Sequence, residues 1–96
     1  MACPLLSKVP DMDAARLLDR IARGHLANIA FSDFARLLVH LGFVRRRVSG
    51  SHRVYAHPSC PALVNIQEVD GKAKAYQVRQ VWRLVERYNM RLGDAP

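Results

Sequence analysis

The sequence lacks several features that would assign it to a membrane-bound or secreted class. No apolar run approaches the roughly 20 residues that a membrane-spanning helix requires. The opening, MACPLLSKVP, has neither the basic start nor the long apolar stretch of a secretory signal. The two cysteines, Cys3 and Cys60, have no paired spacing. A reduced protein of the cytoplasm, without membrane association, is therefore expected.

Acidic residues are also scarce. Asp and Glu number 8 against 15 Lys and Arg, which gives a formal net charge of +7. Most of the excess is arginine, whose guanidinium suits bidentate phosphate contacts. A polyanion, most often nucleic acid, is the expected partner, although an acidic protein would satisfy the same charge. Half of the 96 residues are hydrophobic, so the chain can form one packed core but is too short for two.

The first periodic segment, DAARLLDRIAR at residues 13–23, predicts an amphipathic helix. Asp13 can cap its start, and Gly24 lies where a helix would stop. The residues that share its apolar face are Ala14, Leu17, Leu18 and Ile21.

A second helix is expected in SDFARLLVHLG, residues 32–42. Ser32 is the expected N-cap and Gly42 the expected residue after the last turn. The side chains that should face the core are Phe34, Leu37, Leu38 and Leu41.

After this glycine the hydrophobic period changes. Three short segments rich in β-branched or aromatic residues follow at 43–48, 51–57 and 63–67, and we interpret them as an antiparallel meander. The segment EVDGKAKAY is interpreted as a loop that leads to a long helix over residues 77–91. The apolar face of that helix is predicted to contain Val78, Val81, Trp82, Leu84, Val85, Tyr88 and Leu92. Its other face carries a stripe of Arg79, Arg83, Arg87 and Arg91. The element order indicates an α+β fold.

The stretch RRRVSGSHRVYAHP, residues 45–58, places His52 directly after a Ser-Gly turn and among arginines. Histidine is the side chain best matched to proton transfer near neutral pH. RNA supplies its own nucleophile, the 2′-hydroxyl, so its cleavage needs a proton carrier and positive charge on the developing phosphorane. His52 is therefore the candidate catalyst. The candidate phosphate-binding residues are Arg45, Arg46, Arg47, Ser51, Arg53, Lys72 and Lys74.

Simpler interpretations stay open. A strand histidine is more often a surface or half-buried residue than a catalyst, and an arginine run can position phosphates without chemistry. Alternation along the strand puts His52 and Val54 on one face and Arg53 and Tyr55 on the other. If Val54 faces the helices, His52 faces them too, and it can act only at the end of the sheet.

Metal and nucleotide sites are not favoured. His52, His57 and Cys60 could be grouped as metal ligands, but no second pair of zinc-like spacing follows. The segment GKAK at 71–74 lacks the glycine spacing and the Ser or Thr of a phosphate-binding P-loop. No cofactor is therefore expected.

The chain resembles the HicA (YcfA-like) toxin family of type II toxin–antitoxin systems. The resemblance rests on FSDFARLLVHLGF at 31–43, GSHRVYAHP at 50–58 and the segment 63–88. Its most specific part is a Gly-Phe pair that is followed by a basic strand and then by Gly-Ser-His. It implies an α-β-β-β-α fold similar to double-stranded-RNA-binding domains. That fold has a three-stranded antiparallel sheet with helices on one face, to which this chain adds an N-terminal helix.

The resemblance also implies an organisation and an activity. Residues 1–10 contain two prolines and no periodic pattern, so a flexible tail is expected there. The resemblance then makes residues 11–30 an N-terminal helical extension and 31–96 the HicA-like toxin domain. The activity would be mRNA cleavage without metal, for which the histidine of Gly-Ser-His, here His52, is essential. A HicB antitoxin would cover the active surface, and a homodimer within that complex is left open. The extension could pack on the core, bind the partner or form a dimer contact.

The chain departs from the commonest family pattern on the third strand. Many members carry Pro-x-His there, whereas this chain reads LVNIQ, followed by GKAK and YQVRQ. In this branch Asn65 or Gln67 would orient a phosphate. The missing histidine favours a rival hypothesis, a double-stranded-RNA-binding-like module without turnover. A further alternative is a subunit whose basic surface meets only an acidic protein.

Overall fold

The computed structural model describes residues 12–93, so the predicted tail at 1–10 and Cys3 lie outside the described residues. Seven elements follow one another: α2 (Met12–Ala22), α3 (Phe31–His40), β1 (Val44–Ser49), β2 (His52–His57), β3 (Cys60–Val69), β4 (Lys72–Ala73) and α4 (Ala75–Tyr88). The strands form one antiparallel sheet in the order β1-β2-β3-β4. The predicted α+β class is confirmed, but the sheet has four strands rather than three.

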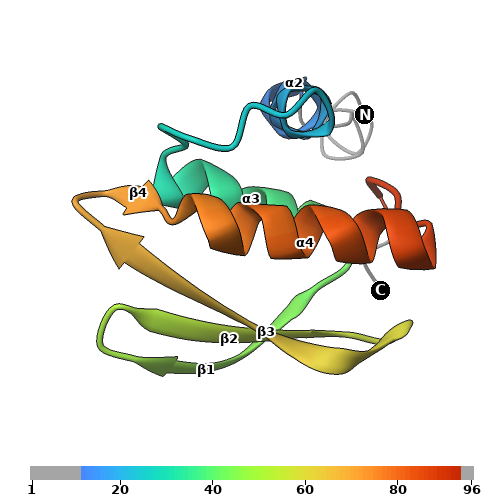
Figure 1. Ribbon diagram of the computed structural model, residues 1–96. Helices are drawn as coiled ribbons and strands as arrows, with labels where there is room; N and C mark the ends of the chain where they lie inside the picture. The colour runs from blue at the N-terminus through green and yellow to red at the C-terminus, as the bar shows by residue number, and fades with distance from the viewer. Residues whose placement is uncertain (1–11, 94–96) are drawn as a thin grey trace, which may run out of the picture.

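The elements are stacked in layers (Figure 1). Helices α3 and α4 lie over one face of the sheet, and α2 packs on the side of this pair that is turned away from the strands. The core fills the space between these layers, and its fully buried members include Phe34, Leu37, Leu38, Leu41, Ile66 and Val78. All four side chains predicted to face inward from the second helix are in this core. Burial of such side chains stabilises the fold by about 1.5–3 kcal/mol each.

The N-terminal helix also belongs to this core. Ala14, Leu17 and Ile21 of α2 are buried in the same cluster as the side chains of α3 and the sheet. This is the predicted apolar face of the first helix. Three roles were considered for the N-terminal extension, and packing on the core is one that its helix α2 performs.

Two predicted helix starts were wrong. Helix α2 begins before Asp13, whose carboxylate lies in the first turn, where it complements the positive end of the helix dipole. Helix α3 begins at Phe31 after Ala30, which adopts extended dihedrals, so Ser32 lies inside the helix and makes no cap. The first turn is instead held by backbone pairing, since Phe31 N–H donates to the Gly71 carbonyl at 2.9 Å.

Helix α4 is displaced from its predicted range and ends at Tyr88, before Arg91. Asn89 adopts a left-handed conformation with φ 51°, and Met90 N–H donates to the Val85 carbonyl at 3.0 Å. This pattern is a Schellman motif, in which the buried side chain of Met90 also joins the core. An asparagine without a following glycine gave too weak a stop signal for sequence reasoning.

The predicted loop after the third strand was also wrong. Strand β3 continues to Val69, turns through Asp70 and Gly71, and returns as β4. Both turn residues have positive φ, 52° and 77°, as the two-residue Asp-Gly turn of a hairpin requires. Likewise, β3 begins at Cys60, inside the segment PSCPA that was interpreted as a connection.

Candidate nucleic-acid interface

His52 lies at the start of β2, directly after a two-residue turn. Ser49 pairs with His52 across the hairpin, and Gly50 and Ser51 form the turn. Gly50 has φ 61° and Ser51 does not have a positive φ, which matches a turn with glycine at its first central position. The turn therefore places the imidazole at the end of the sheet, where it is exposed.

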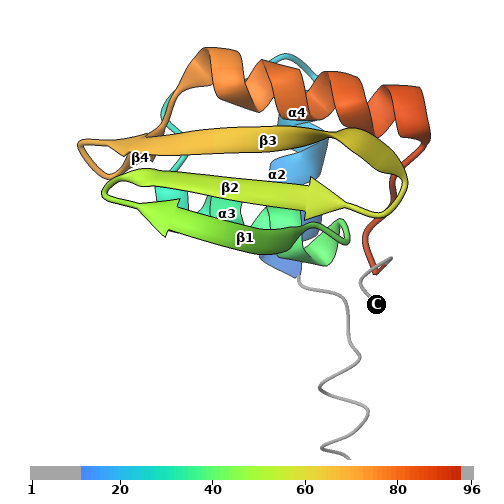
Figure 2. The same ribbon diagram turned by 90° about the horizontal axis from the view of Figure 1, so that it is seen from below.

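The face on which His52 lies follows from the burial of its neighbours. Tyr55 and His57 are buried toward the helices, and Arg53 stacks on the ring of Phe31 in α3 at 4.9 Å. Since side chains alternate along a strand, His52 faces the other way. No described helix covers that face, which is turned toward the viewer in Figure 2. Val54 does not face the helices, so the geometric difficulty foreseen for His52 does not arise.

A β-bulge places two consecutive arginines on this open face. The register between β1 and β2 shifts between Arg45 and Arg47, which leaves Arg46 as the extra residue. In a regular strand the two side chains would point to opposite faces, but a bulge re-aims one of them. Arg46 and Arg47 accordingly line one hollow of about 260 Å³, together with Val54 and Leu63. Both arginines are exposed.

The bulge also sets how far these charges lie from His52. Arg47 pairs with Val54, which is two residues from His52 on the same strand. Strand rise and spacing put the Cα atoms of Arg47 and His52 about 8 Å apart. One phosphate and its neighbouring ribose can therefore contact both side chains.

The other predicted phosphate-binding residues are distributed differently. Arg45 pairs with Tyr55 and lies with Arg53 on the helix-facing side of the sheet. Lys72 is exposed at the β3–β4 hairpin. Lys74 precedes α4 in extended conformation, and its ammonium lies 5.9 Å from the ring of Tyr76. The structure thus brings His52 together with Arg46, Arg47 and Ser51, while the remaining basic residues lie at the rim or on the far face.

Across the next strand pair, His52 lies opposite Gln67 of β3. The position of Gln67 is fixed from behind by Gln77 of α4, which is 5% exposed and whose Oε1 accepts the Gln67 N–H at 2.8 Å. Sequence reasoning missed this support. Its signal is a glutamine next to Val78 on the otherwise apolar face of the helix.

The second histidine of β2 has a structural role. Ser59 N–H donates to Nδ1 of His57 at 3.0 Å, and Nε2 lies 2.9 Å from the Leu41 carbonyl. Because Nδ1 accepts, Nε2 must carry the proton that it donates to this carbonyl. The ring also packs edge-on against Phe43 with centroids 5.1 Å apart. His57 therefore fastens β2 to the end of α3, away from the open face.

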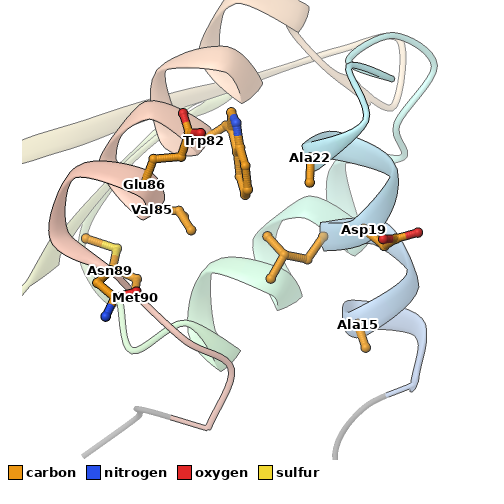
Figure 3. Close-up of a pocket in the computed structure, with 9 residues that line it drawn as sticks. Ala15, Asp19, Ala22, Trp82, Val85, Glu86, Asn89 and Met90 are labelled. Atoms are coloured by element: carbon orange, nitrogen blue, oxygen red, sulfur yellow. The ribbon is translucent and has the colours of Figure 1, made fainter.

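A larger hollow, of about 520 Å³, lies between α2 and α4 (Figure 3). Its walls are apolar, with Trp82 and Val85 facing Ala22 across the gap, and Asp19 and Glu86 are at its rim. It contains none of the predicted site residues. Within residues 12–93, no group of three His, Cys, Asp or Glu side chains is placed to hold a metal ion. None of the described helices is both long and apolar enough to span a membrane.

A basic, uncovered sheet face with an exposed histidine at its edge defines a small α+β protein suited to contact a polyanion. A family model described as HicA toxin of bacterial toxin-antitoxin matches residues 31–86, which is more than half of the chain. The chain belongs to the HicA toxin family of bacterial toxin–antitoxin systems. Neither the curated proteins nor the solved structures gave a match. The match begins at the first residue of α3, so α2 precedes the family's region.

Proposed function

We propose that this toxin is a metal-independent endoribonuclease that cleaves mRNA on the open face of the sheet, with His52 as the proton-transferring residue. The observation that supports it most directly is the exposure of His52 on the face where the bulge gathers Arg46 and Arg47. A buried imidazole, or one on the helix-facing side, could not meet a polynucleotide.

The chemistry needs no group beyond those on this face. The 2′-oxygen of a ribose attacks the adjacent phosphorus, the bond from phosphorus to the 5′-oxygen breaks, and the products carry a 2′,3′-cyclic phosphate and a 5′-hydroxyl. His52 accepts the 2′-hydroxyl proton or donates a proton to the departing 5′-oxygen, and water carries out the other transfer. The guanidinium groups of Arg46 and Arg47 stabilise the charge that develops on the phosphorane.

The remaining predicted residues would hold the RNA on either side of this centre. The Ser51 hydroxyl, in the turn next to His52, and Lys74, beyond Gln67, can each contact a neighbouring phosphate. Lys72 and Arg45 would extend the positive field without contacting the scissile bond. Such backbone contacts carry little base specificity. As a member of a toxin–antitoxin family the chain has an antitoxin partner, which we expect to be a HicB-like protein acting in the cytoplasm.

The test is cleavage of purified mRNA by His52→Ala beside the wild-type chain. The variant should retain its melting temperature and its affinity for RNA, because the side chain is exposed, but produce no cyclic-phosphate ends and no growth arrest. His25→Ala is the matched control, because it removes another exposed histidine that lies in the connection between α2 and α3 rather than in the sheet. Cleavage by His52→Ala at the wild-type rate would remove this residue from the mechanism. Loss of wild-type activity in excess chelator would contradict metal independence.

A second candidate function is RNA binding without turnover. It is favoured by the absence of a second histidine on this face, since the only other histidine of β1 to β3 is His57. This candidate predicts salt-dependent binding that leaves the RNA intact.

A further inference from the structure

The strand at the edge of the sheet is only partly paired. Strand β3 spans Cys60–Val69, but β4 pairs with only Glu68 and Val69. On the side away from β2, no strand in residues 12–93 pairs with the part of β3 before Gln67. An edge of this kind presents backbone groups with which the strand of another chain can pair.

Two hydrogen bonds show which backbone groups point to this edge. Glu68 N–H donates to the Ser51 carbonyl on the β2 side at 3.1 Å, whereas Gln67 N–H donates to Gln77 of α4 at 2.8 Å. Backbone groups alternate in direction along a strand. The N–H groups of Asn65 and Leu63 are therefore directed away from β2, like that of Gln67. The side chain of Gln77 caps this row at one end, and the row continues uncapped along β3.

A hollow of about 320 Å³ accompanies the open edge. It lies between β3 and α4, which runs along this side of the sheet in Figure 2, and it is lined by Ala62, Leu63, Val64, Gln80, Arg83 and Leu84. Leu63 is 64% exposed, the largest exposed fraction of any large hydrophobic side chain in the described residues. The site therefore combines free hydrogen-bonding groups, an apolar contact and, from Arg83, a positive charge.

We propose that this edge is the docking site for an extended, acidic segment of the antitoxin, which adds a further strand to the sheet beside β3. Main-chain hydrogen bonds to Leu63 and Asn65 would provide the pairing. An apolar side chain of the partner would cover Leu63, and a carboxylate would meet Arg83. The proposal rests on membership of a toxin–antitoxin family and does not depend on RNA cleavage.

The charge of the chain favours an acidic occupant over a second copy. Arg79, Arg83 and Arg87 are exposed along α4 at four-residue spacing. Pairing two copies through β3 would bring two such stripes together, in chains that each carry a formal net charge of +7. Like charges placed against one another oppose such an interface. Carboxylates on a partner strand would instead be attracted to the same stripe.

The experiment uses the isotope-labelled full-length chain and a short capped peptide that alternates valine and glutamate. Titration should shift the amide resonances of Leu63 and Asn65 and slow their hydrogen exchange, and should leave the amides of β1 unshifted. A peptide with lysine in place of glutamate should not bind. Because no RNA is present, the result is independent of whether the chain cleaves RNA.

Variants separate the backbone and charge contributions. Leu63→Pro removes the edge N–H and should abolish binding, whereas Leu63→Ala keeps it and should only weaken binding. The side chain of Arg83 is exposed, and Arg83→Glu should weaken binding of the peptide about tenfold. Its matched control is Arg16→Glu, which makes the same charge change at an exposed position of α2, the helix that lies on the far side of α3 and α4 from the sheet.

Three results would overturn the proposal. The first is the absence of shifts in these amides at millimolar peptide. The second is equal binding of the lysine peptide, and the third is a dimer of the free chain that Leu63→Pro dissociates, since the edge would then be occupied by a second copy.

Discussion

The two arginines that share the open face make a quantitative prediction about RNA binding. The change is Arg46→Ala with Arg47→Ala, made in the His52→Ala variant so that the RNA is not consumed during the measurement. Both side chains are exposed and line one hollow beside Val54. Their removal should therefore alter contacts with phosphate while the core keeps its packing.

The magnitude follows from counterion release. Each phosphate contact to single-stranded RNA contributes about 0.7 to the slope of the logarithm of affinity against the logarithm of salt. Loss of two contacts should lower that slope by about 1.4. Over a fourfold rise in salt concentration, the affinity of the parent should then fall about sevenfold more than that of the variant.

The assay is fluorescence anisotropy with a labelled single-stranded RNA over a series of salt concentrations. The matched control is Arg16→Ala with Arg20→Ala, which removes the same charge from α2, beyond α3 and α4 from the sheet. It should leave the slope close to that of the parent. If both double variants lower the slope equally, RNA binds through the overall charge of the chain and the bulged face is no interface.

Further predictions concern stability and the placement of His52. His57→Ala removes two hydrogen bonds and the edge-on contact with Phe43, so it should lower the free energy of unfolding by about 3 kcal/mol. Denaturant unfolding measures this, and a loss below about 1 kcal/mol would contradict the structural role. Gly50→Ala introduces a side chain at φ 61°, which should cost about 1–2 kcal/mol and reduce cleavage of RNA. Its matched control is Gly24→Ala, at φ 94° in the turn after α2. This control should lower the melting temperature by a similar amount without changing the cleavage rate of the folded protein. Equal losses of cleavage rate in both variants would show that the Gly50 turn has no particular role in catalysis.

The helices were the best-predicted part of the fold. Each has an apolar stripe at helical spacing, and burial of that stripe follows from the hydrophobic effect wherever the helix packs. The stops at Gly24 and Gly42 were also predictable, since a left-handed residue after a helix favours glycine. Helix starts were less predictable from the sequence. Helix α3, for example, begins with backbone pairing between Phe31 and Gly71, which lies forty residues further along the chain.

The number and the bounds of the strands were predicted less well than those of the helices. Asp70 and Gly71 are a strong hairpin signal, but the two-residue strand that follows is too short to show an alternating pattern. It is held as a strand by pairing with Val69 and by the bridge to Ala30. The bridge to Ala30 joins segments that are distant in the sequence, which no local pattern displays.

The candidate site divides in the same way. The sequence alone determined that the chain is basic, that one histidine follows a glycine turn among arginines, and which helical faces are apolar, because these depend on composition and on local periodicity. Only the tertiary structure decided that His52 points away from the helices and that Arg46 and Arg47 lie on its side. The faces of a strand are equivalent until a core covers one of them, and a single bulged residue reverses the alternation on either side of it.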